Sequence, residues 1–397
     1  MTLIEMEAWS QADIALSHDQ AAELAGLGLV DVVAQPHSDE WVLVANSRIG
    51  VALGKGWELR VRPRLAVPKL FFLLAYAADA KGWKDESVDF AFEPDLLDAV
   101  ASGFSWHALG ALERGLLRGY VHIDERLTTI RGRVRFGDQI ARSVSLPLPV
   151  EVSYDDYTED VLENRMLKTA TLSLLRLPRV PALARKRLLK LRGLMDTVSL
   201  VERPREVAMP PLTRLNERYG ASLRLAELIL HASSIDASKG PLAAAAFVFD
   251  MNKVFEDFVS TAFREAMQPY GGVVKGQWTG SLDVERRLGI RPDITWWSGT
   301  NCLAVADAKY KALELKGMPN ADAYQMLAYC TALGLERGFL VYANDSGEDP
   351  RSHRVRNSDC VIEVRTLDVE AEPKDLLKQV ETLAGEIWSS GVLQKAA

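Results

Sequence analysis

The spacing of apolar residues changes character twice along the chain, and this limits the folds that the chain can adopt. Up to about residue 65, apolar and polar residues alternate, as in Trp57-Glu-Leu-Arg-Val-Arg, which is the two-residue period of a half-buried strand. Between 160 and 233 the apolar residues recur at helical spacing, and from 247 onward helical and strand patterns alternate. The sequence therefore predicts a multidomain α+β protein.

The chain length and the positions of its prolines suggest the domain boundaries. With 397 residues, the chain exceeds the size at which a single core usually stops growing, about 250–300 residues. Pro147 and Pro149 interrupt the pattern, as do Pro204, Pro210 and Pro211. We expect a β-rich domain over 1–145, an α-helical connector over 146–245 and an α/β domain over 246–397. Within the first two we expect helices over 69–80, 94–118, 160–177, 182–201 and 216–233, and strands around 128–136.

The last domain has the order of elements that a mixed α/β core requires. The patterns predict helices over 250–268 and 321–333, with strands near 275–286, 290–297, 302–309, 337–343 and 360–366. Such an order places a sheet between helices. We therefore expect a domain with its own core here.

Composition excludes some classes of protein. A net charge of −7 argues against coating nucleic acid by bulk electrostatics, so any DNA contact must be local or supplied by a partner. The longest apolar run, Leu70 to Ala78, is much shorter than the roughly 20 residues that span a bilayer. The first residues lack the pattern of a signal peptide, and the three cysteines form no CxxC pair. We expect a cytoplasmic protein with no membrane segment.

Two acids and a lysine carry the strongest chemical signal. Asp293 follows Pro292 at the start of an apolar strand pattern, and Asp307 and Lys309 lie two residues apart in the next one. Side chains alternate along a strand, so Asp307 and Lys309 point to the same side. Two carboxylates can hold Mg²⁺, or Mn²⁺, and still leave room for water and a phosphate oxygen. This set predicts metal-dependent hydrolysis of a phosphodiester.

The acid-x-lysine spacing alone is weak evidence, because it recurs at 314–316 and 372–374. For Asp307 and Lys309 by themselves, a partly buried ion pair is an equal alternative. Two predicted helices add to the metal-site interpretation. Glu256 lies at the edge of an apolar helix face, where it can turn toward the metal as a third ligand, and Asp250 suits the N-cap of that helix. On the second helix, Gln325 can bond a metal-bound water or a phosphate.

Together these residues resemble the PD-(D/E)xK nuclease pattern. More narrowly, the segments Phe-Asp-Met-Asn-Lys-Val-Phe-Glu-Asp-Phe-Val (249–259) and Tyr-Gln-Met-Leu-Ala-Tyr (324–329) are similar to the McrC family, the nuclease subunits of methylcytosine-dependent restriction systems. Segments at 131–136 and 154–170 also resemble that family, although Pro63-Arg64 stands where Pro-Lys is expected. The resemblance implies a PD-(D/E)xK domain with Glu256, Asp293, Asp307, Lys309 and Gln325 in its site. It also implies an AAA+ GTPase ring of the McrB kind as partner, which reads the methylated base and on which the N-terminal half docks.

Three functions follow as hypotheses. The first is a Mg²⁺-dependent endonuclease subunit that cuts double-stranded DNA in phage defence and stimulates a GTPase motor. The second is an assembly factor and GTPase activator that rarely cuts, and the third is a free-standing repair nuclease. The chain has no Gly-x-x-x-x-Gly-Lys-Ser/Thr motif, so we expect it to bind no nucleotide by itself. The basic segment 176–192 suits DNA phosphates, an acidic partner or simply a solvated helix face.

Overall fold

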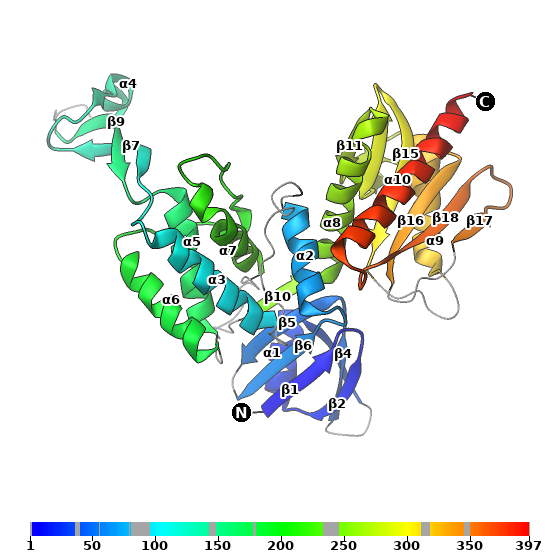
Figure 1. Ribbon diagram of the computed structural model, residues 1–397, viewed down its shortest axis with the longest axis horizontal. Helices are drawn as coiled ribbons and strands as arrows, with labels where there is room; N and C mark the ends of the chain where they lie inside the picture. The colour runs from blue at the N-terminus through cyan, green and yellow to red at the C-terminus, as the bar shows by residue number, and fades with distance from the viewer. Residues whose placement is uncertain are drawn as a thin grey trace. The chain divides into compact units, whose positions relative to one another are not determined.

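A computed structural model describes residues 2–35, 40–54, 56–78, 80, 96–142, 148–177, 180–232, 246–310, 318–344 and 350–396. The chain divides into two compact units (Figure 1). Unit 1 combines Met1–Leu96 with Val248–Ala397, and unit 2 consists of Leu97–Phe247. The fold is mixed α/β with several separate sheets, which agrees with the predicted class. Among the described residues, no helix is both long and apolar enough to cross a membrane.

The first part of unit 1 contains two small sheets. One has the order β1 (Thr2–Glu7), β6 (Trp57–Arg62), β5 (Arg48–Gly54) and β10 (Ala246–Asp250). The other has the order β2 (Gln11–Ala15), β4 (Glu40–Ala45) and β3 (Val30–Ala34). Helix α1 (His18–Leu27) was not predicted, although Ser17 and Gln20 form a capping box at its start.

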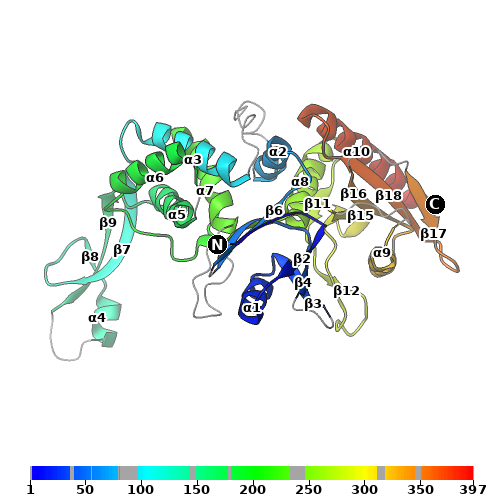
Figure 2. The ribbon, with the colours of Figure 1, turned by 90° about the horizontal axis from the view of Figure 1, so that it is seen from below.

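The second part of unit 1 is built on a six-stranded sheet. Its order is β11 (Val273–Gly276), β14 (Ile294–Ser298), β15 (Asn301–Lys309), β16 (Arg337–Asn344), β18 (Val361–Asp368) and β17 (Arg351–Arg354). The three central strands β15, β16 and β18 are parallel, and the outer pairings are antiparallel. Figure 2 shows helix α9 (Asn320–Leu333) on one face of this sheet, and α8 (Met251–Ala266) and α10 (Pro373–Ala396) on the other.

Sequence features explain why α8 starts where it does. The Asp250 side chain accepts a hydrogen bond from the Asn252 backbone N–H at 3.0 Å, so the predicted N-cap is confirmed. Val254, Phe255 and Phe258 are buried, as the predicted apolar face requires. The helix is therefore fixed both at its N-terminus and along one face.

Contacts between distant parts of the sequence join residues 1–96 to residues 248–397. Helix α2 (Val67–Ala78) meets α8 through aromatic rings, because the Phe258 centroid lies 5.7 Å from that of Phe72 and 5.6 Å from that of Tyr76. The Ser47 hydroxyl donates to Asp250 Oδ1 at 3.0 Å. The N-terminal segment therefore packs with the C-terminal one, whereas the sequence-based boundaries placed them in separate domains.

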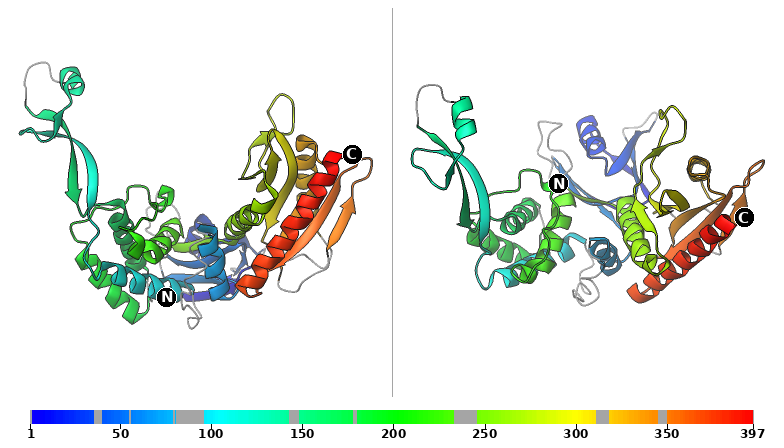
Figure 3. Two further views of the ribbon diagram at one scale, coloured as in Figure 1. Left: turned by 45° about the horizontal axis from the view of Figure 1, so that its top comes forward. Right: turned by 90° about the horizontal axis from the view of Figure 1, so that it is seen from above.

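Unit 2 is a group of helices that carries a β-arm. The helices are α3 (Leu96–Leu112), α5 (Leu162–Arg176), α6 (Ala182–Leu194) and α7 (Gly220–Ala232), with short 3₁₀ turns at Pro204–Glu206 and Glu217–Tyr219. The arm comprises β7 (Gly119–Leu127), β8 (Arg133–Val134), α4 (Phe136–Arg142) and β9 (Val150–Thr158). Figure 3 shows the arm extending away from the helices of its own unit.

The arm corrects two details of the sequence-based expectation. Strand β7 pairs with β9 from Gly119↔Thr158 to Leu127↔Val150, so the expected boundary at 145/146 falls inside one hairpin-like unit. The strands expected around 128–136 are confirmed only in part, because β7 ends at Leu127, β8 covers Arg133–Val134 and α4 begins at Phe136. Alternation of apolar residues located the β-structure here but not the pairing of its strands.

The ends of other helices and strands differ from the prediction by a few residues, and the structure contains elements that were not predicted. The helix expected over 94–118 ends at Leu112, and the strand expected over 275–286 is divided into β11 and a short β12 (Gly280–Ser281), which pairs with β13 (Gly289–Ile290). Strand β17 and helix α10 were not predicted. In the basic segment, Arg176 ends α5 and residues 182–192 lie in α6, where Arg185, Lys186 and Lys190 are exposed. Its role stays an open prediction.

Candidate functional site

Strands β14 and β15 bring the two predicted acids together. They are antiparallel, with Ile294 opposite Ala306 and Thr295 opposite Val305. Continuing this register places Asp293 opposite Asp307, on the sheet face that α9 covers through Met326 and Tyr329. Asp293 and Asp307, fourteen positions apart, thus meet because β15 runs antiparallel to β14 and lies beside it.

Asp307 and Lys309 form an ion pair at the end of β15. The Lys309 Nζ lies 2.5 Å from Asp307 Oδ2, and the Asp307 side chain is almost fully buried, with 2% exposed. Burial alone would lower the pKa of Lys309, but the neighbouring carboxylates of Asp307 and Asp293 outweigh it and raise that pKa. Lys309 is therefore held as a cation beside the acids.

Asp293 is bound to the backbone of the same strand. Its Oδ2 accepts a hydrogen bond from the Ala308 N–H at 2.9 Å, and its own N–H lies 3.4 Å from Asp307 Oδ1. Burial, followed by the charges of Asp307 and Glu256, raises the pKa of Asp293 to about 8. In the absence of a further cation, this carboxyl group therefore holds a proton at neutral pH.

Helix α9 supplies a chain of hydrogen bonds to Lys309. Lys309 Nζ donates to Gln325 Oε1 at 3.1 Å, and Gln325 Nε2 donates to the Tyr329 hydroxyl at 2.7 Å. That hydroxyl in turn donates to the Arg291 carbonyl at 3.1 Å. Gln325 therefore orients Lys309, and Tyr329, which is buried in the core, ties α9 to the segment that carries Asp293.

Glu256 reaches the site through a residue that sequence reasoning missed. Gln277 Nε2 donates to Glu256 Oε1, and Gln277 Oε1 accepts from the Arg291 guanidinium. The Gln277 N–H also donates to the Asp293 carbonyl at 2.9 Å. Gln277 thus links Glu256, Arg291 and Asp293, although nothing in its local sequence distinguishes it from a surface glutamine.

A second residue that sequence reasoning missed, Asp322, acts on Lys309 through its charge. Asp322, at the start of α9, is buried and accepts a hydrogen bond from the Tyr342 hydroxyl at 2.6 Å. Its charge also helps to raise the pKa of Lys309. Three acids, Asp293, Asp307 and Asp322, therefore act on Lys309, and Glu256 acts on Asp293.

The donor groups present suit a hard divalent cation. Asp307 Oδ2 is buried and makes no hydrogen bond, its contact being the ion pair with Lys309. Among the described residues, no three Asp, Glu, His or Cys side chains lie close enough to form a metal site by themselves. Asp293 and Asp307 would then be the side-chain donors, with water or a ligand oxygen completing the coordination, as Mg²⁺ prefers. Glu256, which accepts from Gln277, stays a prediction as a metal ligand.

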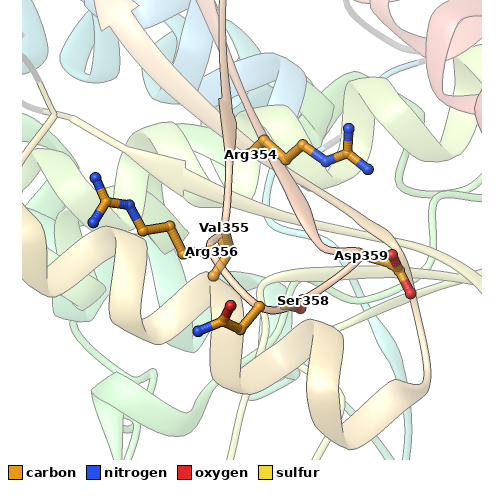
Figure 4. A pocket seen from close by; sticks show the side chains of 6 residues that line it. Arg354, Val355, Arg356, Ser358 and Asp359 are labelled. Carbon is orange, nitrogen blue, oxygen red and sulfur yellow. The ribbon is translucent and has the colours of Figure 1, made fainter.

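A separate hollow lies at the turn between β17 and β18. It has a volume of about 520 Å³ and is lined by residues 354–359. Figure 4 shows the side chains of Arg354 and Arg356 extending away from each other. Arg354 pairs with Val361 at the start of β18, whereas the Lys309 end of β15 aligns, through Tyr342, with Thr366 near its end. The hollow therefore lies at one end of β18, and Lys309 is level with the other end.

One solved structure resembles nearly the whole chain in fold, and a second is similar over a smaller part. One is a chain of a refined half-complex from a tetradecameric assembly of Thermococcus gammatolerans McrB AAA+ hexamers with bound McrC; it has 18% sequence identity and a TM-score of 0.58, over 96% of this chain and 100% of that one. A chain from the cryo-EM structure of the T. gammatolerans McrBC complex matches with 20% identity and a TM-score of 0.39, over 68% of this chain and 90% of that one. At 18% identity, the likeness to the first structure concerns the fold alone.

Comparison by sequence gives the family. No curated protein matches the sequence significantly. A family model described as "McrBC 5-methylcytosine restriction system component" matches residues 43–343, which cover most of both units and all five predicted site residues. The match includes the strands that carry Asp293, Asp307 and Lys309 as well as the β-arm. The chain therefore belongs to the family of McrBC 5-methylcytosine restriction system components.

Proposed function

We propose that this chain is the DNA endonuclease subunit of a modification-dependent restriction complex. The observation that carries the proposal is the grouping of Asp293, Asp307 and Lys309 on one sheet face, with Gln325 bonded to the lysine. Buried acids that share one lysine are costly in a structural role and are favourable around a cation. The sheet with helices on both faces is, on this proposal, a PD-(D/E)xK nuclease domain.

The residues of the site have distinct roles in phosphodiester hydrolysis. Asp293 and Asp307 hold the divalent cation, Mg²⁺ or Mn²⁺. When bound, such an ion supplies positive charge at the phosphate and lowers the pKa of a water molecule. Lys309 contacts a phosphate oxygen or orients the attacking water, and Gln325 restricts the lysine to that position. The Tyr329–Arg291 hydrogen bond keeps helix α9 and Asp293 at a fixed separation.

The raised pKa of Asp293 makes this site dependent on its ion. Without a cation the carboxyl group holds a proton near neutral pH because of burial and the charges of Asp307 and Glu256. A bound divalent cation reverses that electrostatic balance and favours both ionised carboxylates. We therefore expect metal binding to release protons and to strengthen as pH rises toward 8.

The β-arm is the element that we assign to the partner. Six large apolar side chains are exposed on it: Tyr120, Ile130, Phe136, Ile140, Leu148 and Tyr157. Exposed apolar groups gathered on one element mark a protein-binding surface. By its fold, this chain is similar to a chain from a structure of McrB AAA+ hexamers with bound McrC. We therefore propose an McrB-like AAA+ GTPase ring as the partner, with double-stranded DNA as substrate and no membrane association.

The arm also supports a second function, stimulation of the partner GTPase. Apolar side chains that extend beyond the helices of unit 2 suit contact with another protein more than cleavage chemistry, which resides in unit 1. The two functions are separable, because the arm and the acids belong to different units. A cytoplasmic location is the setting in which both would act.

Replacing Asp307 by Asn tests the nuclease assignment. The variant keeps the size of the side chain but removes a metal ligand, so DNA cleavage by the assembled complex should fall to background while GTPase stimulation by this chain remains. The matched control is Asp31→Asn, an exposed acid on β3. Cleavage by the Asp307 variant at the wild-type rate would mean that these acids are a structural ion-pair cluster.

A further inference from the structure

A short hairpin leads directly into the candidate site. Strands β12 and β13 pair Gly280 with Ile290 and Ser281 with Gly289, and Asp293 follows three residues later. We call residues 280–290 the entrance hairpin; Figure 2 shows it, at the label β12, extending beyond the six-stranded sheet of unit 1. The entrance hairpin is therefore the hairpin next to Asp293 in sequence, and a ligand bound at Asp293 lies close to its base.

The base of the entrance hairpin is anchored to the core of the site. Ile290 is buried in the cluster that contains Tyr329, and Trp278 packs against the same cluster. A Cβ atom at position 280 would lie only 2.2 Å from the Trp278 ring, so glycine is required where the hairpin starts. The position of the hairpin is therefore coupled to the position of α9 and of the acids.

The tip is held in one conformation by Asp283. Its carboxylate accepts hydrogen bonds from the Ser281 hydroxyl at 2.7 Å and from the backbone N–H groups of Arg287 and Leu288 at 2.9 and 2.7 Å. Arg286 adopts a left-handed backbone conformation with φ of 59°. Such a turn is preorganised, so little conformational entropy is lost when it binds a ligand.

The preorganised tip presents apolar side chains to solvent. Val284 is 95% exposed and Leu288 is 58% exposed. Arg286 and Arg287 lie beside them, and neither forms an ion pair within the described part of the chain. A rigid tip with apolar and cationic groups and no intramolecular partner is suited to an external surface that is apolar in its interior and anionic at its edges.

Local charge favours DNA as that surface. The two arginines of the entrance hairpin balance its two acids, Asp283 and Glu285, and the flanking Lys275 and Arg291 give residues 271–291 a net charge of +2 in a chain of net charge −7. One of these acids, Asp283, is already engaged by the turn. The major groove of B-DNA, about 12 Å wide, admits a two-stranded β-ribbon, and thymine methyl groups there offer apolar contacts. Phosphates on both edges match the two arginines.

We propose that the entrance hairpin inserts its tip into the major groove of duplex DNA next to the scissile phosphate. Val284 and Leu288 contact base methyl groups, and Arg286 and Arg287 contact the flanking phosphates. The hairpin thereby positions the sugar–phosphate backbone of the DNA over Asp293 and Asp307. This inference rests on the proposed nuclease function, because it takes duplex DNA as the ligand.

DNA binding, measured separately from cleavage, tests the inference. We would use the full-length chain in an Asp307→Ala background, with and without its GTPase partner, and follow the anisotropy of a labelled duplex. Val284→Ser/Leu288→Ser should weaken binding about tenfold. Arg286→Gln/Arg287→Gln should reduce the slope of log affinity against log salt by about 2, since each phosphate contact contributes about 0.9. The matched controls are Val33→Ser and Lys374→Gln/Lys378→Gln, which alter exposed residues elsewhere.

A thymine-to-uracil duplex distinguishes groove contact from charge alone. Removing the thymine methyl groups should weaken binding by the wild-type tip and leave the Val284→Ser/Leu288→Ser variant unaffected. Equal DNA affinities of the hairpin variants and the controls would overturn the inference. It would also be overturned if the chain bound no DNA, or if the hairpin variants lost affinity for the partner protein and kept their affinity for DNA. Loss of cleavage in Asp307→Asn together with normal binding by the hairpin variants would refute the hairpin and leave the nuclease assignment intact.

Discussion

The acid site of unit 1 and the β-arm of unit 2 depart from the usual distribution of side chains in opposite ways. The site buries Asp307 and Asp322 among apolar residues, whereas the arm exposes Tyr120 and Phe136 to solvent. Buried charge and exposed large apolar groups are both more informative than the reverse arrangement. The first arrangement concentrates electrostatic energy for chemistry, and the second leaves apolar surface for another protein. On the proposed function, the two regions divide cutting and docking between the units.

Asp293→Asn should give the largest effect and should affect only the unit 1 function. Loss of a metal-binding carboxylate is expected to reduce the cleavage rate about 1000-fold, equivalent to about 4 kcal/mol in the activation free energy. Single-turnover cleavage by the assembled complex measures this, and partner GTPase stimulation serves as the control. A variant that loses both activities would show that the two regions are not independent.

The pH dependence of stability should show that the acids are arranged for an ion. Because the folded pKa of Asp293 is raised from 3.8 to about 8, the folded protein without metal holds a proton that the unfolded chain releases. The contribution of Asp293 to folding stability is therefore fully present below about pH 4 and is lost as pH rises toward 8. Chemical denaturation from pH 5 to pH 8 in a chelator should show this decline, and Asp293→Asn should flatten it. A stability that rises through this range in the wild type would contradict the account.

Tyr120→Ser/Tyr157→Ser should affect the docking function and leave the acids unchanged. These rings lie 5.1 Å apart across β7 and β9, and both are more than half exposed. Aromatic anchors at interfaces commonly contribute about 2 kcal/mol or more, so partner affinity should fall about 30-fold. Unfolding free energy should change by less than about 1 kcal/mol. Unaltered partner affinity in a pull-down titration, with Val33→Ser as the comparison, would remove the arm from the interface.

Gln277→Ala should have the smallest effect on cleavage. It tests how much the hydrogen bonds around the site contribute to its function. Gln277 connects Glu256 to Arg291 without contacting Asp307 or Lys309 in any hydrogen bond of the described structure. We expect cleavage to fall about tenfold, equivalent to about 1.4 kcal/mol, and the Mg²⁺ concentration for half-maximal rate to rise. Gln277→Glu, which places a further charge there, should be worse than alanine. An unchanged Mg²⁺ dependence would limit Gln277 to a packing role.

Local sequence pattern predicted those features of the site that lie within single elements. The two-residue spacing of Asp307 and Lys309 gave their common side, and Asp250 gave the N-cap of α8. Gln277 and Asp322 were not predicted, because their importance arises from contacts with residues distant in sequence. The same reason explains the domain boundaries: the contact of Phe72 with Phe258 cannot be derived from either segment alone.

Uptake of Mn²⁺ by the full-length chain tests most directly whether the buried acids form a metal site. Free Mn²⁺ would be followed by its electron paramagnetic resonance signal at pH 8, with an uncleavable duplex present. We expect the wild type to bind the ion and the Asp293→Asn/Asp307→Asn variant to lose that binding. Asp19→Asn/Asp31→Asn, which alters exposed acids, should bind as the wild type does. Equal Mn²⁺ uptake by the wild type and the Asp293/Asp307 variant would contradict the account.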